Sequence, residues 1–342
     1  MSCTILCGGF WGDEGKGKVV AYLSSTDKPD AAVRTGVGPN AEHGFIFEGK
    51  RYDLRQITCA FVCETAKLFI GAGVLVNPEI FLKEIEKTKT QKRIWIDRQC
   101  GIIEKRHIKA EHSSEHFTGK IKTMGMGCGP ANADRANRIL KIAEDIDELE
   151  PFLTNVSDEL NDVLEGGGSV LIEGSQGCSL SLLHGTYPYV TSKDTTACTL
   201  AADAGIGPLK VNDVVVAFKS YVTRASPGPL ANEYSFEEIK QLGLEEAETA
   251  IVYERPGGIR RVGRFDFEIA KRALRINSAT QIALTCIDKL YPECRGIKSY
   301  EELSTQAKDF ISDIETKLEV PVTLISTGPA THETIDMRET KL

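Results

Sequence analysis

The sequence predicts an α/β fold with a mostly parallel central sheet and helices on both of its faces. Short runs rich in β-branched residues recur along the chain, and segments with helical periodicity separate several of them. Such alternation favours parallel strands, because each crossover helix packs back onto the sheet. A glycine-rich turn also joins the first of these runs to the first helix, which is where many α/β proteins bind phosphate.

Eight runs have the length and composition of buried strands. They are Cys3–Cys7, Ala32–Arg34, Lys67–Ile70, Arg93–Ile96, Ser169–Ile172, Asp213–Phe218, Gln281–Thr285 and Pro321–Ile325. The predicted helical segments are Val19–Leu23, Pro78–Thr88, Ala131–Ile146, Phe265–Arg275 and Tyr300–Leu318. In the last of these, apolar side chains recur at close to the 3.6-residue period of an amphipathic helix.

The length of 342 residues would allow two domains, but the chain shows no internal repeat, no low-complexity segment and no linker. We therefore expect a single elaborated α/β domain over residues 1–342. The segment Ser226–Pro256 is polar and contains Pro227, Pro229 and Pro256, so it is predicted to form an excursion from the main sheet.

The charge of the chain limits its partners. Asp and Glu outnumber Lys and Arg by 49 to 41, and the net charge of −8 argues against a broad nucleic-acid surface, though not against a small anionic ligand. No apolar run reaches the roughly 18 residues of a membrane span, and the N-terminus lacks a signal-peptide pattern. The ten cysteines form no CxxC pair. We expect reduced thiols and a cytoplasmic protein with no nucleic-acid or membrane partner.

The glycine-rich turn spans Gly8–Lys18 and differs from a standard P-loop. Its spacing is stretched, and Gly17 stands where a Ser or Thr would ligate magnesium. Glycines let backbone N–H groups approach phosphate oxygens, and the dipole of the following helix favours an anion. Asp13 and Glu14 are unusual in a loop that only binds anions, so a carboxylate here could hold a metal or act as a base. The alternative is a structural turn with a solvated acidic pair.

Three further clusters carry polar residues that could take part in chemistry. Gly36–Gly44 contains His43, a residue type suited to acid catalysis, although a lone loop histidine is more often packed or on the surface. Lys122–Arg138 has the pattern of a glycine-rich loop that leads into a basic helix. Glu173–Gly177 follows a predicted strand, as a site loop should, and His184–Thr196 comes soon after it. These polar side chains could equally be hydrogen-bonding groups of the core.

Together, these segments resemble the adenylosuccinate synthetase family. The resemblance rests on motifs in family order over nearly the whole chain: Trp11–Lys18, Asn40–His43, Gly127–Ala131, Gln176–Gly177, His184–Ser192, Arg260–Gly263 and Ser326–Pro329. The stretches GDEGKGK and HGTYPYVTS are each highly specific. The short length and Ser192–Asp194 are similar to the archaeal branch of the family.

The resemblance implies a two-step ligation on a purine nucleotide. A nucleoside triphosphate phosphorylates O6 of a 6-oxopurine nucleoside monophosphate, and the amino group of L-aspartate then displaces phosphate at C6. Asp13 would remove the N1 proton and contact Mg²⁺, and His43 would be the acid for phosphoryl transfer. Gln176 would hold the charge that develops at the 6-position. Glu42 is an added carboxylate and a second candidate ligand of the metal.

The same resemblance implies a set of binding residues. The triphosphate would be bound by Gly12, Glu14, Gly15, Lys16, Gly17 and Lys18. The monophosphate would be bound by Asn40, Thr123, Thr191 and the Arg138 of a second subunit, which implies a homodimer. Arg260 would lie in the aspartate region, while Asp288, Ser326 and Gly328 would lie beside the base of the donor.

Several loops depart from the family pattern, and they suggest a changed substrate. Glu42 replaces a Gly of the family pattern, Met124 a Thr, Ala225–Ser226 a Val-Gly pair, Gly258 an Arg and Arg264 a Trp. Loss of an arginine near the ribose suits a 2′-deoxyribose, and Glu42 could accept hydrogen bonds from an added exocyclic amine. The first hypothesis is therefore dGMP, converted to N6-succino-2-amino-2′-deoxyadenylate as in phage enzymes that make diaminopurine DNA. The alternative is an adenylosuccinate synthetase that uses IMP, L-aspartate and GTP in AMP synthesis.

Two further points stay open at the level of sequence. Retention of Asp13 counts against the typical phage type, in which a Ser replaces it. Asp288 suits a guanine base, so GTP is one candidate donor, and ATP or dATP would accompany the dGMP hypothesis. The rival from another class is a nucleotide-binding protein without catalysis, and a retained Asp13–His43 base and acid pair argues against it.

Overall fold

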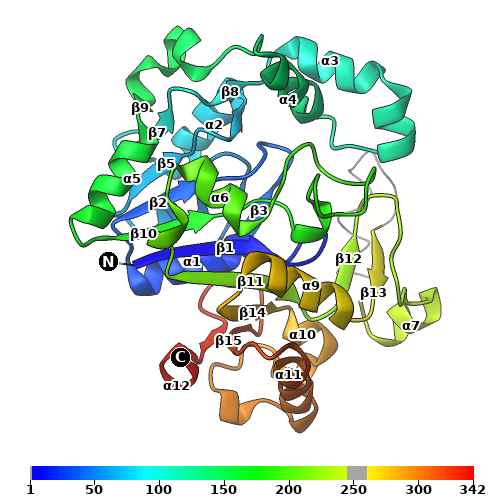
Figure 1. Cartoon of the computed structure of the whole chain (residues 1–342). Helices are drawn as coiled ribbons and strands as arrows, with labels where there is room; N and C mark the ends of the chain where they lie inside the picture. Colours follow the sequence, from blue (N-terminus) through cyan, green and yellow to red (C-terminus); the bar gives the residue numbers. More distant parts are fainter. Residues whose placement is uncertain (1, 245–259) are drawn as a thin grey trace.

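The computed structural model describes residues 2–244 and 260–342, and its centre is a ten-stranded sheet (Figure 1). In spatial order the strands are β16 (Thr334–Asp336), β15 (Val322–Ser326), β14 (Gln281–Thr285), β11 (Asp213–Lys219), β1 (Ser2–Gly8), β10 (Ser169–Glu173), β2 (Ala31–Arg34), β5 (Lys67–Ile70), β7 (Ile94–Asp97) and β9 (Leu153–Thr154). Every neighbouring pair is parallel except β15 and β16. The mostly parallel sheet is confirmed, and all eight predicted strands belong to it.

Three small sheets lie outside the central one. They pair β3 (His43–Phe47) with β4 (Lys50–Leu54), β6 (Leu75–Val76) with β8 (Gly101–Ile102), and β12 (Val222–Arg224) with β13 (Arg261–Gly263). Of the segment expected to leave the sheet, residues 226–244 hold α7 (Phe236–Gln241), and residues 245–256 lie outside the described residues.

Helices cover both faces of the sheet, and a separate hydrophobic core lies between the sheet and the helices on each face. The longer helices are α1 (Lys16–Asp27), α2 (Pro78–Thr88), α3 (Lys105–Ser113), α4 (Cys128–Asn137), α5 (Val156–Glu165), α6 (Ala197–Ala204), α9 (Phe267–Asn277) and α11 (Thr305–Leu318), with the short α10 (Ile287–Leu290) and α12 (Arg338–Lys341) near the C-terminus. One core takes side chains from α1 and α2, and the other from α5, α6, α9 and α11. Successive residues of β1 alternate between them, since Ile5 and Cys7 enter one core and Leu6 enters the other.

Two predicted helices are shorter than expected, for local reasons. The helix predicted over Ala131–Ile146 ends at Asn137, because Arg138 takes the left-handed conformation (φ 63°) that terminates α4. The helix predicted from Tyr300 begins at Thr305, because the Ser304 hydroxyl accepts a hydrogen bond from the amide of Ala307 and caps it there.

The topology of the sheet gathers polar residues at one edge. β1 lies between β10 and β11, so the strand that follows it in sequence, β2, is one position removed. Adjacent parallel strands therefore end side by side at Gly8, Arg34, Glu173, Lys219 and Thr285. In open α/β sheets ligands bind at such a switch point, beyond the carboxyl ends of the strands.

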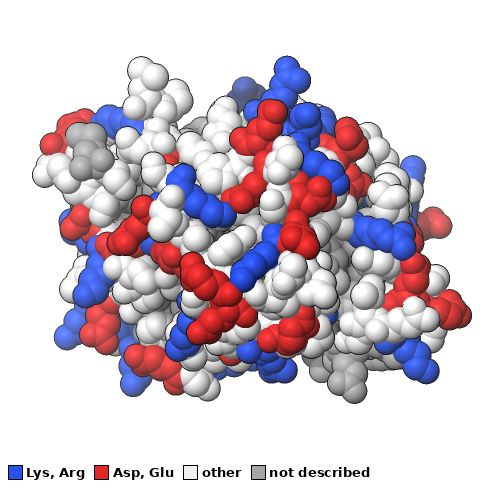
Figure 2. All heavy atoms as spheres, turned by 90° about the horizontal axis from the view of Figure 1, so that it is seen from below, with Lys and Arg blue, Asp and Glu red and all other residues white. Residues whose placement is uncertain are grey.

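Two surface properties complete the description of the fold. None of the described helices combines the length and apolar character needed to span a bilayer. Figure 2 views the molecule from below and shows Lys and Arg side chains interspersed with Asp and Glu over that face. Such mixing does not form the continuous basic footprint that a nucleic-acid backbone requires.

Candidate active site

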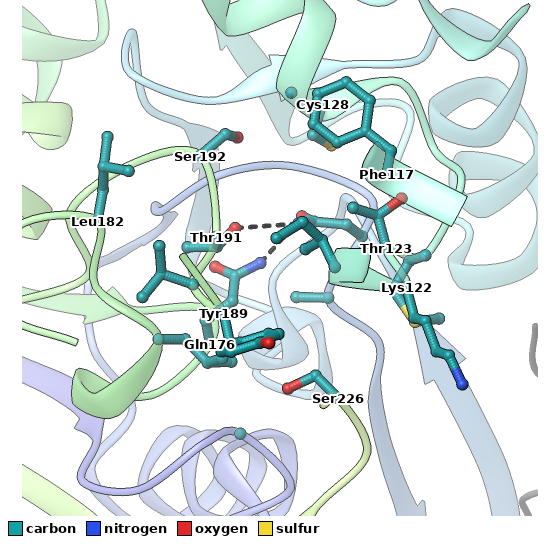
Figure 3. Close-up of a pocket in the computed structure, with 18 of the residues that line it drawn as sticks. Phe117, Lys122, Thr123, Cys128, Gln176, Leu182, Tyr189, Thr191, Ser192 and Ser226 are labelled. Carbon is teal, nitrogen blue, oxygen red and sulfur yellow. Dashed lines mark hydrogen bonds between the residues drawn. The ribbon is translucent and has the colours of Figure 1, made fainter. Parts of the chain in front are cut away.

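A cavity of about 580 Å³ opens at the carboxyl edge of the sheet. The phosphate loop, the start of β3, the loop before α4 and the segment after η5 (Cys178–Leu180) all contribute to its walls (Figure 3). The structure brings the following predicted site residues together in its lining: Gly12, Asp13, Lys16, Asn40, Glu42, His43, Thr123, Gln176 and Thr191. The cavity therefore joins segments that lie more than a hundred residues apart in the sequence.

Glu14 shapes the phosphate loop from within. Its fully buried carboxylate accepts hydrogen bonds from the backbone amides of Phe10 (3.0 Å) and Gly12 (2.8 Å), and from the ammonium of Lys16 (2.6 Å). An anion inside a turn of converging N–H groups is the arrangement that such loops favour. Glu14 therefore faces the loop's own donors and is not half of a solvated acidic pair.

Asp13 lies at the mouth of this loop and faces the cavity. Its backbone is left-handed (φ 63°), a conformation that is uncommon for residues other than glycine and that concentrates at functional sites. Its side chain is 29% exposed, and its carboxylate lies 3.1 Å from Nε of Arg260. The predicted base and the predicted aspartate-region arginine are therefore in direct contact.

Gly17 explains how the first helix approaches the predicted acid. A Cβ atom at this position would lie 2.8 Å from Cβ of His43 and 3.1 Å from Sγ of Cys59. Real Cβ atoms do not approach other atoms so closely without a shift of the structure. The place that a Ser or Thr occupies in a standard P-loop is thus filled by the histidine, and a glycine is needed there.

His43 is held from one side and open on the other. Its Nδ1 lies 2.5 Å from a carboxylate oxygen of Glu173 and also contacts the guanidinium of Arg34. Its Nε2 is buried and has no hydrogen-bond partner among the described residues, and the side chain lines the cavity. Burial and the nearby Arg34 lower the pKa of His43 to about 3, so the ring is neutral at physiological pH.

Glu173 is the centre of a buried network that sequence reasoning left without a role. One carboxylate oxygen accepts from Arg34 and contacts His43, while the other accepts from the Thr58 hydroxyl (2.6 Å) and the Cys59 amide (2.7 Å). Burial alone would raise the pKa of Glu173, but Arg34 and the hydrogen bond to His43 outweigh it and lower the pKa to about 2. The available signal was a charged residue at the last position of an otherwise apolar strand, which applies to Glu173 and Arg34 alike.

A chain of hydrogen bonds crosses the cavity wall at Gln176. The Ser175 hydroxyl donates to Oε1 of Gln176 (2.6 Å), and Nε2 of Gln176 donates to Oδ1 of Asn40 (2.9 Å). Nδ2 of Asn40 then donates to the Thr191 hydroxyl (3.3 Å), as the dashed lines in Figure 3 show. Gln176, like Asp13, is left-handed (φ 60°). Three predicted substrate-contacting residues are thus linked to one another.

Two other predicted residues lie differently from the rest. The Glu42 carboxylate is engaged by the guanidinium of Arg55 at 2.5 Å, and Arg55 also donates to the Pro39 carbonyl. Arg138 is exposed at the end of α4 and is not among the described side chains that line the cavity.

The predicted donor-base residues lie outside the large cavity, across the phosphate loop. Asp288 is buried in α10, and burial raises the pKa of its carboxyl. The Thr285 hydroxyl, at the end of β14, donates to the carbonyl of Glu14 at 2.9 Å and so joins this region to the loop. Lys18 points to the same side and binds the segment that contains Ser326 and Gly328.

Comparison with known proteins agrees with this geometry. The family model described as adenylosuccinate synthetase matches residues 5–146 and 139–293. Adenylosuccinate synthetases of Methanocaldococcus jannaschii and Methanosphaera stadtmanae are 53% and 52% identical to the chain, and each alignment covers at least 99% of the chain and 97% of the relative.

Two solved structures share the fold. One is the fully ligated adenylosuccinate synthetase of Plasmodium falciparum, with a TM-score of 0.88 and 24% identity over 97% of this chain and 99% of that one. The other is the succinoaminodeoxyadenylate synthetase of cyanophage S-2L bound to dGMP and dATP, with a TM-score of 0.81 and 23% identity over 98% of this chain and 95% of that one. On the family match and the full-length archaeal relatives, the chain belongs to the adenylosuccinate synthetase family and is an NTP-dependent ligase that forms a C–N bond.

Proposed function

We propose that the protein joins IMP and L-aspartate at the expense of GTP, forming adenylosuccinate, GDP and phosphate. The observation that carries this proposal is the pairing of Asp13 and His43 at one cavity. A carboxylate at the mouth of the phosphate loop and a buried imidazole whose Nε2 has no partner in the described part of the chain both line it. A protein that only bound nucleotides would need neither a base nor an acid at this place.

IMP now replaces dGMP as the preferred acceptor. The archaeal relatives that share more than half of their residues with the chain are named adenylosuccinate synthetases, whereas the phage enzyme bound to dGMP is 23% identical. The Glu42 carboxylate, expected to accept from an exocyclic amine, is already paired with Arg55. The other basis for dGMP, Gly258, lies outside the described residues. The diaminopurine hypothesis therefore has less support than the alternative.

The two chemical steps assign complementary tasks to the lining residues. Asp13 takes the N1 proton, which raises the electron density on O6 as that oxygen attacks the γ-phosphorus of GTP and GDP leaves. The neutral His43 ring would donate from Nε2 to an oxygen of the transferring phosphoryl group, in the tautomer whose Nδ1 accepts from Arg34. Gln176 donates to the purine 6-position through its amide, which Ser175 and Asn40 hold in place. The amino group of aspartate then attacks C6, and the C6–O6 bond breaks as phosphate departs.

The remaining residues bind the reactants. Asn40, Thr123 and Thr191 lie in the cavity lining and are proposed to bind the monophosphate, together with Arg138 from a second subunit. Arg260 is buried against Asp13, close enough to the chemistry to hold a carboxylate of aspartate. Asp288 suits the N1–H and 2-amino donors of guanine, which favours GTP over ATP or dATP.

Mg²⁺ fits one of the two predicted ligands. Magnesium usually keeps several waters and takes one or two protein carboxylates together with the phosphates of the substrate. Asp13 offers a partly exposed carboxylate beside the phosphate loop and fits this pattern. Glu42 fits less well, because its carboxylate lies 2.5 Å from the guanidinium of Arg55, whereas Asp13 lies 3.1 Å from that of Arg260. Bound there with the triphosphate, the ion would neutralise charge on the transferring phosphoryl group.

A substrate matrix tests the proposal. Purified protein would receive IMP, GMP, dIMP or dGMP, with aspartate and with GTP, ATP or dATP, and phosphate release would be followed. We expect turnover with IMP and GTP, and loss of turnover in Asp13→Asn and His43→Gln proteins that stay folded. Preference for dGMP over IMP would overturn the substrate assignment. Nucleotide binding without phosphate release on any acceptor would favour the non-catalytic rival.

A further inference from the structure

We propose that Lys18 is a positioning residue that holds the donor-base segment, residues 326–333, against the first helix and so sets the affinity for the donor nucleotide. The inference rests on the proposed function, because it takes this segment to be the binding place of the donor base. It reassigns Lys18, which the sequence placed among the triphosphate ligands.

The contacts of Lys18 are directed entirely at that segment. Its side chain is 6% exposed, and its ammonium donates to the Ser326 hydroxyl (2.5 Å) and to the carbonyls of Gly328 (2.5 Å) and Glu333 (2.7 Å). An ammonium has three N–H groups, so its donors are all used. The bonded groups lie more than 300 residues further along the chain, so this contact is purely tertiary.

The segment is also bound to β3, because Thr331 donates through its amide and its hydroxyl to the carbonyl of Ile46 (both 2.8 Å). Its own bonds are short-range: Thr327 donates through its amide to the Glu333 carbonyl (3.0 Å), and the Glu333 carboxylate accepts from the Ala330 amide (2.7 Å). The Thr327 hydroxyl also donates to the carbonyl of Ile297 (2.7 Å). Among the described residues, Lys18 is therefore the side chain of α1 that hydrogen-bonds directly to the segment.

Burial of the Lys18 ammonium costs free energy of desolvation, so the lysine is expected to have a role that an apolar side chain could not fill. Burial lowers the pKa of Lys18 to about 8, although Cys286, Glu333 and Asp288 nearby favour its charge. A methionine would fill a similar volume without that cost, but it has no N–H groups to donate. What the lysine adds is three directed hydrogen bonds to the segment 326–333.

The first turn of α1 thus serves both ends of a nucleotide. Lys16 faces the phosphate loop through Glu14, and Lys18, two residues later, faces the base segment. Residues two apart on a helix point in clearly different directions, as these do. The spacing between the triphosphate and the base is then set by a rigid helical turn. Release of Lys18 should weaken the donor while sparing the acceptor.

The test is the Lys18→Met variant of the full-length protein, with Lys83→Met on the exposed face of α2 as a matched control. Steady-state rates would be measured while GTP, IMP and aspartate are varied in turn. We expect KM for GTP to rise about tenfold or more, as the loss of charged hydrogen bonds implies, with KM for IMP within about twofold of the parent protein. Hydrogen exchange should quicken in residues 326–333 and nowhere else in the C-terminal region.

A second variant keeps the proposal testable if Lys18→Met does not fold. Ser326→Ala removes one acceptor of the lysine with little change in volume, so it should fold and should also quicken exchange at Gly328 and Glu333. If both variants fold, a protein that carries both substitutions should show a smaller rise in KM for GTP than the product of the two single rises, because both break the same contact. Unchanged donor KM and unchanged exchange in active Lys18→Met protein would overturn the proposal. Absence of activity in the parent protein would instead overturn the proposed function. Hydrogen exchange in residues 326–333 of the Lys18→Met protein would still test whether Lys18 holds that segment.

Discussion

The two ring nitrogens of His43 have opposite surroundings, and this difference defines the site at the scale of single residues. Nδ1 is fixed by Glu173 and Arg34, whereas Nε2 is buried and has no hydrogen-bond partner among the described residues. A histidine that must act at one nitrogen needs its other nitrogen held, because that contact sets the ring orientation and the tautomer. Glu173 therefore orients the ring of His43 although it does not line the cavity.

Replacement of Glu173 by glutamine tests this role. The variant keeps the volume but loses the negative charge and one acceptor facing His43, so kcat is expected to fall about tenfold or more with little change in KM for IMP. Glu84→Gln is the matched control, because Glu84 is also buried and binds the amides of Arg55, Gln56 and Ile57. A control that loses as much kcat as Glu173→Gln would contradict a specific role in positioning His43.

The same pair of residues makes the fold sensitive to acid. The folded protein holds the pKa of His43 at about 3 against an ordinary 6.5, so between these values the unfolded chain binds the extra proton. The free energy of unfolding should therefore fall as the pH drops below 6.5. Glu173, with its pKa lowered to about 2, adds to the loss below its ordinary value of 4.5.

Urea unfolding at about pH 7 and about pH 4.5 measures this effect, followed by the change in transition midpoint. The His43→Gln variant cannot take up the proton, so its midpoint should shift less between the two conditions than that of the parent protein. Equal shifts in both proteins would show that other groups cause the acid sensitivity.

Sequence reasoning predicted residues that the structure brings to one cavity, but not the directions in which their side chains point. Asp13, His43 and Gln176 were found from motifs, and the structure places all three in one cavity lining. Glu14 and Lys18 belong to the same motif, yet one turns into the loop and the other toward a segment some 300 residues away. The identities of neighbouring residues do not reveal such contacts, because the contacts depend on tertiary packing.

At the scale of elements, the close approach of α1 to β3 depends on one glycine. Gly17→Ala would place a methyl group 2.8 Å from Cβ of His43, so either the helix or the strand must shift. We expect a loss of stability of about 1–3 kcal/mol, typical of overpacking, together with a lower kcat from displacement of the histidine. Gly207→Ala is the control, because a Cβ there meets nothing within 4 Å and φ is −67°. Thermal unfolding and steady-state kinetics of both variants would decide, and wild-type behaviour of Gly17→Ala would contradict the packing argument.

Element boundaries were predictable where capping residues mark them and were missed where a backbone conformation does. Pro78–Thr88 was predicted to the residue, since Asn77 caps its start and a proline follows directly. The end of α4 was missed by nine residues, because the stop is the left-handed conformation of Arg138 and not a glycine or proline. Arg138 is exposed at this helix end and does not line the cavity of its own subunit.

At the scale of the whole molecule, the class of fold followed from alternation, but the order of strands did not. Local patterns predicted eight strands of a parallel sheet, while the insertion of β1 between β10 and β11 depends on contacts across the entire chain. That order is what brings Arg34 and Glu173 to adjacent strand ends and creates the pocket beyond them. The site thus belongs to the topology as much as to the motifs.

A second copy of the chain is the proposed source of the Arg138 at each monophosphate site. Arg138 is exposed at the end of α4, outside the cavity lining of its own subunit, and its neighbour Ile139 is an apolar side chain that is 64% exposed. If Arg138 completes the monophosphate site of a partner, then Arg138→Met and His43→Gln should each be nearly inactive alone. Mixing them should restore activity, because a mixed dimer joins an intact His43 of one subunit with an intact Arg138 of the other. Random exchange restores up to about a quarter of the sites of a dimer.

Phosphate release after mixing and subunit exchange measures this recovery, with a mixture of two His43→Gln preparations as the inactive control. Full activity of Arg138→Met alone would show that the arginine has no such role, and no recovery in mixtures that form dimers would place its action within its own subunit.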